Sequence, residues 1–160
     1  MIKIIATASI VLSGALFGRI LCRTEKDTLD KAEELYDLIY HIKEEIKNKS
    51  APLDRIFSDF MSRKGSDFMK EKFKHTHGSY GEKFLLLCTE ICSERTKNEL
   101  KDFALTLGKL DKESQEASLN KAHSVMEKEL EAMREGAASK NRLYKALSLL
   151  VSCIIAVLLY

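Results

Sequence analysis

The residues best suited to bind a metal gather in the middle of the sequence. His75 and His77 are separated by one residue, and Cys88 and Cys92 are one helical turn apart. Structural zinc needs four converging nitrogen or sulfur ligands, usually from more closely spaced cysteine pairs. Because Cys88 and Cys92 fall on a predicted apolar helical face, each is expected to behave as a small hydrophobic side chain. We therefore predict no metal site and no bound cofactor.

The sequence also offers few arrangements for catalysis. It contains neither a glycine-rich phosphate-binding loop nor an HExxH zinc motif. His41 and His123 stand alone on predicted helices, and no serine or cysteine nucleophile lies at a convincing spacing from either. Acidic residues are plentiful, but they spread over faces that the charge pattern predicts to be solvated. We predict that the protein is not an enzyme.

Composition limits both the partners and the fold class. The 160 residues include 26 Lys and Arg against 24 Asp and Glu, and the two signs are interspersed. Nucleic-acid binding needs clustered cations that displace counterions from phosphates, so no nucleic-acid partner is expected. A chain with one proline and many Glu, Lys, Leu and Ala residues favours long helices over sheets. The sequence thus predicts an all-α protein, with a charged domain between two apolar ends.

Residues 24–140 form the predicted helical domain. From residue 28 to residue 47, apolar residues recur at spacings of three and four, which predicts a helix with one buried face. These residues are Leu29, Ala32, Leu35, Leu38, Ile39, Ile42 and Ile46. Gly108 marks the end of a later helix. Signals that start further helices are Ser50, Ser66, Ser79, Thr96 and Asp111. The domain therefore contains four to six helices joined by short breaks.

The last helix of this domain has an apolar repeat close to a heptad. Its members are Leu119, Ala122, Met126, Leu130, Met133 and Ala137. A heptad repeat is typical of a coiled-coil seam, which would make the protein a membrane-anchored scaffold or a signalling coiled coil. A helix that packs inside its own domain produces a similar repeat, and this second interpretation is favoured.

Apolar segments at both ends predict two transmembrane helices. Residues 1–22 reach the length that crosses a bilayer if Lys3 and Arg19 extend their charges towards the headgroups. A cleaved signal peptide is the alternative, but no small-x-small cleavage site follows the apolar core before Arg19. Residues 143–160 are almost wholly apolar, and the alternative for both segments is a buried hairpin of the two ends.

Positive charges orient the two segments in the same way. They flank the inner end of each segment: Arg19, Arg23 and Lys26 follow the first, and Lys140, Arg142 and Lys145 precede the second. By the positive-inside rule, the middle of the chain faces the cytoplasm and both ends lie across the membrane. Gly14 and Gly18 form a GxxxG pair in the first segment, which predicts that these two residues pack against another membrane helix.

The turn within residues 107–115 is the best candidate for a special surface. Its functional interpretation is partner docking by Gly108, Asp111 and Gln115. Its structural interpretation is a helix C-cap at Gly108 and an N-cap at Asp111, with Gln115 bonding locally. The structural interpretation is favoured, and both are left open to test.

Two stretches carry a resemblance to a known family. Residues 106–115 contain the pattern Leu-Gly-x-x-Asp-x-x-x-Gln, and residues 141–160 run from a basic start into an apolar tail. With these features, and with the apolar segment at its start, the sequence resembles the stage III sporulation protein AB family over nearly its whole length.

The resemblance implies a fold and a function. The family is similar to the cytoplasmic domain of type II secretion system F proteins, which implies an antiparallel helical bundle of about six helices flanked by the two transmembrane helices. Members belong to a channel-like complex in the mother-cell membrane around the forespore. The implied role is a non-catalytic platform, whose partners are the stage III sporulation protein AA ATPase, other subunits of the complex and the lipid bilayer. A homo-oligomer is compatible with this role.

Overall fold

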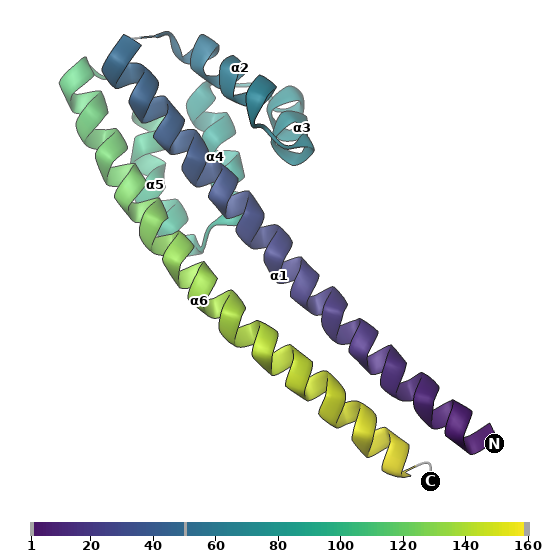
Figure 1. Cartoon of the computed structure of the whole chain (residues 1–160). Helices are drawn as coiled ribbons and strands as arrows, with labels where there is room; N and C mark the ends of the chain where they lie inside the picture. Colours follow the sequence, from purple (N-terminus) through teal and green to yellow (C-terminus); the bar gives the residue numbers. More distant parts are fainter. Residues whose placement is uncertain (1, 50, 159–160) are drawn as a thin grey trace. The chain divides into compact units, whose positions relative to one another are not determined.

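The computed structural model describes residues 2–49 and 51–158, and the side chains of some helical residues, among them most of residues 2–18, fall outside the description. Over these ranges every regular element is an α-helix, so the predicted all-α class is confirmed. The helices are α1 (Ile2–Lys49), α2 (Leu53–Arg63), α3 (Asp67–His75), α4 (Tyr80–Ile91), α5 (Glu94–Thr106) and α6 (Lys112–Leu158), labelled in Figure 1.

The chain divides into two compact units. The bundle unit, Asp30–Glu131, holds the later part of α1, all of α2 to α5 and the beginning of α6. The terminal unit, Met1–Leu29 with Ala132–Tyr160, holds the beginning of α1 and the rest of α6. The limits predicted for the central domain and for the two membrane anchors stay predictions.

One face of α1 lies in the core of the bundle unit. Its fully buried residues are Ala32, Leu35, Leu38, Ile39 and Ile42. Leu29 and Ile46, at the two ends of the predicted face, are half-buried. The spacing of three and four predicted this face because residues at those spacings share one side of a helix.

Four of the six heptad residues of α6 are buried in the same unit, whereas Met133 and Ala137 belong to the terminal unit and are half-buried. Leu119, Ala122, Met126 and Leu130 are each at most 4 % exposed. The Sδ atom of Met126 lies 3.7 Å from the Sγ atom of Cys92, at the end of α4. Because a single chain already covers this face, the repeat reflects packing inside the bundle unit rather than a seam between two chains.

Aromatic rings join the short helices to one another. The ring of Phe57 in α2 stacks on Tyr80, with centroids 4.8 Å apart, and lies 5.2 Å from the ring of Phe73. Phe84 of α4 meets Phe103 of α5 edge-on at 5.2 Å. Such ring pairs add about 0.5–1.5 kcal/mol to the free energy gained by burial alone. They therefore fix how α2 to α5 meet.

A glycine allows α4 and α5 to approach closely. A Cβ atom added at Gly81 would lie only 1.9 Å from the carbonyl oxygen of Ala104. No side chain can occupy that space, so the hairpin of α4 and α5 requires glycine at this position. The two helices lie side by side, and each begins after a short loop.

The predicted helix starts at Ser66 and Ser79 are confirmed. Ser66 accepts a hydrogen bond at the start of α3, and Ser79 forms a capping box with Glu82 at the start of α4. The predicted start at Ser50 lies outside the described residues, and Pro52 stands at the N-cap of α2. Proline suits this place because its fixed φ angle is compatible with the first turn of a helix.

The predicted start at Thr96 is wrong. Ser93 caps α5, because its side chain accepts the backbone N–H of Thr96 at 3.4 Å. Thr96 lies inside the first turn, is only 6 % exposed and donates its hydroxyl hydrogen to Glu129 at 2.8 Å. The patterns that start at Ser93 and at Thr96 overlap, and the one that forms has Ser93 as the cap and leaves Thr96 buried.

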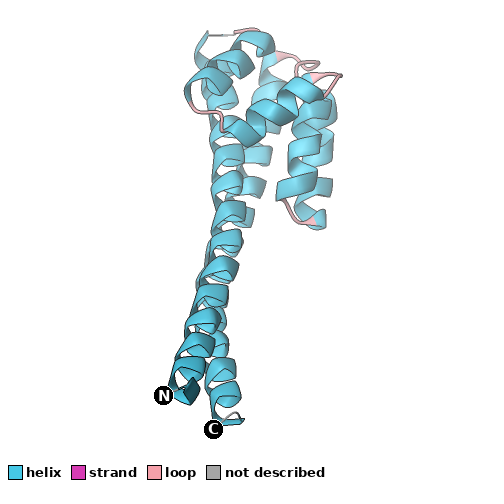
Figure 2. Ribbon diagram, turned by 90° about the vertical axis from the view of Figure 1, so that its right-hand side faces the viewer, coloured by secondary structure: helices cyan, strands magenta, loops and turns pink. Residues whose placement is uncertain are grey.

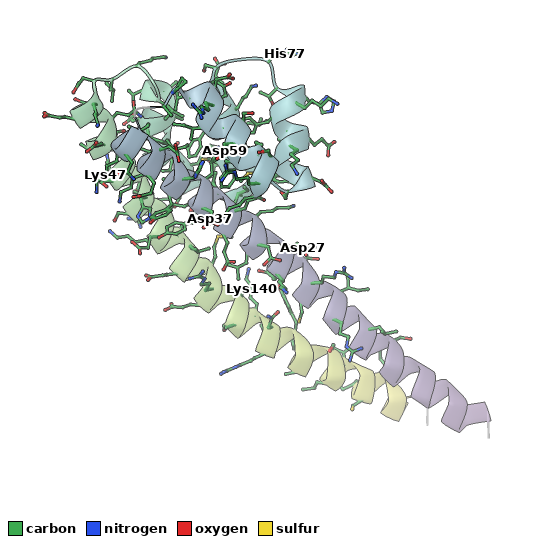
Figure 3. The ribbon with its side chains drawn as sticks, turned by 45° about the horizontal axis from the view of Figure 1, so that its top comes forward. Asp27, Asp37, Lys47, Asp59, His77 and Lys140 are labelled. Carbon is green, nitrogen blue, oxygen red and sulfur yellow. The ribbon has the colours of Figure 1, made fainter. Side chains whose placement is uncertain are left out.

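In the terminal unit, the beginning of α1 and the end of α6 run side by side in opposite directions (Figures 1 and 2). Lys140 donates a hydrogen bond to the carboxylate of Glu25 at 3.1 Å, and Lys140 is one of the residues labelled in Figure 3. The Sγ atom of Cys22 lies 4.0 Å from the backbone oxygen of Asn141, which it faces as a weak donor. These contacts fix the register of the pair.

Large apolar side chains of the terminal unit are exposed. They are Leu16 and Ile20 of α1, and Leu143, Leu147, Leu150, Val151, Ile154 and Ile155 of α6. None of the helices, over their described residues, combines the length and apolar character that crossing a bilayer requires. Gly14 and Gly18 lie within α1, but their surroundings fall outside the described side chains.

Candidate functional site

The turn between α5 and α6 is built around a glycine. α5 ends at Thr106, close to the predicted position, and Gly108 follows with a φ angle of +77°. This left-handed conformation disfavours any residue with a Cβ atom. The space is also taken, because a Cβ atom added at Gly108 would lie 2.5 Å from Cδ1 of Leu53.

Asp111 caps the start of α6, as predicted. Its Oδ2 atom accepts the backbone N–H of Ser114 at 3.2 Å, which satisfies one of the free donors at a helix start. Hydrogen bonds from the side chain and the backbone of Ser114 lower the pKa of the Asp111 carboxyl below its ordinary value. The Asp111 carboxylate therefore already accepts hydrogen bonds from its own chain.

Gln115 ties the turn to the first turn of α6. It is only 4 % exposed, and its Oε1 atom accepts the backbone N–H of Gly108 at 3.1 Å. The predicted local bond of Gln115 is thus present, and the three residues singled out in the sequence form one local structure. The Nε2 atom of Gln115, however, is buried and has no hydrogen-bond partner in the described part of the chain. An unpaired buried donor typically costs about 1–3 kcal/mol.

A hollow of about 290 Å³ lies beside this turn, and we call it the Gln115 hollow. Its walls come from the end of α1, the loop before α2, and the turn before α6. The lining residues are Ile46, Ala51, Pro52, Leu53, Gly108, Leu110, Lys112 and Gln115. The Nζ atom of Lys112 donates to the backbone oxygen of Lys47 at 3.3 Å, near the end of α1. Lys47 is labelled in Figure 3.

The cysteines and histidines of the predicted metal-like group do not come together. His75 and His77 are exposed, whereas Cys88 is fully buried. A hydrogen bond with Cys92, together with burial, raises the pKa of the Cys88 thiol far above its ordinary value, so this thiol stays protonated. No cluster of three His, Cys, Asp or Glu side chains that could hold a metal ion occurs among the described residues.

The two remaining histidines contact aromatic or acidic groups that the sequence analysis did not connect with them. The ring of His123 lies between those of Tyr36 and Tyr40, with centroids 4.7 and 6.0 Å away. Burial lowers the pKa of His123 below its ordinary value. The Nε2 atom of His41 lies 3.8 Å from a carboxylate oxygen of Asp59, which Figure 3 labels. Tyr36 and Tyr40 are one helical turn apart, so their side chains lie on the same face of α1. This spacing is the feature of the sequence that could have indicated the aromatic contacts of His123.

Glu129 of α6 was also missed as a polar anchor. Its carboxylate accepts hydrogen bonds from the backbone N–H of Ser93, the hydroxyl of Ser93 and the hydroxyl of Thr96, at 2.8, 3.1 and 2.8 Å. Burial alone would raise the pKa of Glu129, but these hydrogen bonds outweigh it and hold the pKa below its ordinary value. The group joins the start of α5 to α6.

With this geometry established, the chain can be compared with known proteins. The sequence model of the stage III sporulation protein AB family matches residues 3–160. The chain belongs to this family. As a stage III sporulation protein AB family member, it acts in sporulation, and the resemblance that the turn around Gly108 and Gln115 carried is confirmed. Comparisons with curated proteins and with solved structures gave no match.

Proposed function

We propose that this stage III sporulation protein AB family member is a non-catalytic platform in the mother-cell membrane around the forespore. Both ends anchor it, and the bundle unit faces the mother-cell cytoplasm. There it docks the stage III sporulation protein AA ATPase and neighbouring subunits of the complex. Membership of the family supports the sporulation role, and the exposed apolar side chains of the terminal unit carry the anchoring.

The proposed membrane anchoring rests on apolar side chains of the terminal unit that would otherwise be exposed to water. Leu143, Leu150 and Ile154 are each between 51 and 55 % exposed on α6. A contiguous apolar surface of this kind marks a membrane or protein interface in natural proteins. The two ends do pair as a hairpin, but the hairpin does not bury these side chains. Lipid is the solvent that would cover them.

The positive charges support the proposed orientation. Arg19 and Arg23 are exposed on α1, and Lys140 and Arg142 are exposed on α6. In the terminal unit, the register set by Lys140 and Glu25 brings these two groups of cations to the same stretch of the helix pair. Such cations remain on the cytoplasmic side of a bilayer.

Membrane extraction and protease protection test the anchoring. We expect the full chain in sporulating cells to stay in the pellet after alkaline carbonate treatment. Protease added outside intact protoplasts should leave the bundle unit undigested. A matched chain that lacks residues 143–160 should be extracted more easily. Release of the full chain into the supernatant would contradict the anchoring.

Deletion and binding assays test the platform role. Loss of the gene should block sporulation after engulfment, and spore yield measures this. The full chain in lipid nanodiscs should bind the purified stage III sporulation protein AA ATPase, as measured by biolayer interferometry, whereas empty nanodiscs should not. Normal spore yield in the deletion strain, or no binding of the ATPase, would count against the proposed role.

A further inference from the structure

The Gln115 hollow contains a polar group that its own chain leaves unpaired. Gln115 is 4 % exposed, and no acceptor among the described residues meets its Nε2 atom. Turning the amide over would not help, because Oε1 already accepts the N–H of Gly108 at 3.1 Å and Nε2 could not. Gln115 is also one of the residues that line the hollow.

The surroundings of Gln115 favour an occupant with a negative charge. The hollow lies at the N-terminus of α6, where the helix dipole places partial positive charge. Lys112 adds a cationic side chain to the lining, and Lys109 is exposed in the same turn. Two acidic residues lie nearby, but neither lines the hollow: the carboxylate of Asp111 caps Ser114, and Glu113 is exposed in the first turn of α6.

The other walls of the hollow are apolar. They come from Ile46, Ala51, Pro52, Leu53 and Leu110. The hollow has a volume of about 290 Å³, far more than the ~15 Å³ that a single water requires, so side chains can enter. Leu110 is 39 % exposed at the edge, so an apolar residue beside the acidic one would gain a contact.

We propose that the Gln115 hollow receives an acidic side chain, with an adjacent apolar residue, from a protein partner. The carboxylate accepts a hydrogen bond from Nε2 of Gln115 and lies close to the cation of Lys112. The apolar neighbour contacts Pro52 and Leu110. This inference rests on the docking role proposed above, because it locates the surface on which a partner binds.

The sequence provides a direct reporter, because Gln115 is its single glutamine. The full chain in nanodiscs, labelled with ¹⁵N only in glutamine side chains, gives one pair of amide proton signals. The probe is the dipeptide N-acetyl-leucyl-glutamate with an amidated end, which has one carboxylate and one apolar side chain. We expect it to shift the Gln115 signals with a dissociation constant on the order of 1 mM, as suits so small a ligand.

Matched variants and probes separate the hollow from general effects. The neutral dipeptide with glutamine in place of glutamate should cause at most a small shift. Lys112→Ala should weaken binding of the acidic dipeptide at least fivefold. The control Lys101→Ala removes an exposed lysine from α5, outside the lining, and should leave binding unchanged. Unchanged Gln115 signals before titration show that each variant is folded.

The possible results decide the inference and the proposed function separately. No shift at tenfold the expected dissociation constant, or an equal shift with the neutral dipeptide, overturns the hollow as an acidic-residue site. A shift that grows with the concentration of the chain itself assigns the hollow to a second copy and also overturns it. If the ATPase binds the full chain but the acidic dipeptide does not shift the Gln115 signals, the platform role stands without this site. If the acidic dipeptide binds while the ATPase does not, the site stands and the proposed partner fails.

Discussion

In the turn before α6, replacement of Gly108 should have the most direct effect on the stability of the protein. Its φ angle of +77° disfavours a side chain, and an added Cβ atom would lie only 2.5 Å from Leu53. We expect Gly108→Ala to lower the free energy of unfolding of the bundle unit by about 1–3 kcal/mol. Chemical denaturation followed by circular dichroism measures this change.

Gly136 is the matched control for that substitution. It lies within α6, and a Cβ atom added there meets nothing within 4 Å. Gly136→Ala should therefore leave the protein unchanged or stabilise it by up to about 1 kcal/mol, because alanine favours the helix. Equal effects of the two substitutions would show that the left-handed conformation of Gly108 is not a constraint.

At the scale of single residues, the caps and the local bonds of the turn could be predicted from the sequence, whereas the Gln115 hollow could not. Gly108 and Asp111 match the C-cap and N-cap signals of the sequence, and Gln115 bonds locally, as predicted. The hollow also needs Pro52 and Leu53, which are more than fifty positions away in the sequence. Only the fold brings that loop to this turn, and no spacing in the sequence reveals the unpaired Nε2 atom.

Among the helices, the contact of α6 with the start of α5 depends on a single carboxylate. Glu129 has a pKa held below its ordinary value by Ser93 and Thr96, so the folded state favours its charged form. This stabilisation is present above the pKa of the unfolded chain and is lost as the pH falls through the lower folded pKa. Glu129→Gln should lower the free energy of unfolding by about 1 kcal/mol at neutral pH and by less in acid.

Denaturation midpoints at neutral and acidic pH measure the effect of Glu129→Gln. Glu131→Gln, on an exposed position of the same helix, is the control and should have no effect at either pH. A loss for Glu129→Gln that is equal at both pH values would mean that hydrogen bonding to the charged form does not stabilise this contact.

The helices themselves show why periodicity predicts faces better than boundaries. The buried face of α1 repeats over several turns, so a single exception such as the half-buried Ile46 does not hide it. The start of α5 depended on one cap among two overlapping candidates. Ser93 prevails there because Thr96 gains burial and a bond to Glu129, which only the folded bundle provides.

For the whole chain, the division into two compact units predicts independent folding of the bundle. Residues 30–131 hold the buried faces of α1 and α6 together with α2 to α5. We expect this fragment to be helical and to unfold in one cooperative transition, because its core comes from within the unit. Thermal unfolding by circular dichroism and by calorimetry checks this. A molten, non-cooperative fragment would show that the terminal unit is needed for folding.

The pairing of the beginning of α1 with the end of α6 brings the first turn of α1 and the last turn of α6 to the same end of the terminal unit (Figures 1 and 2). A short glycine-rich linker could therefore join them, and the backbone could be opened instead in the exposed loop at His77 and Gly78. Such a circular permutant keeps every helix and changes only their order along the polypeptide. We expect such a permutant to fold, because the same helices would make the same contacts.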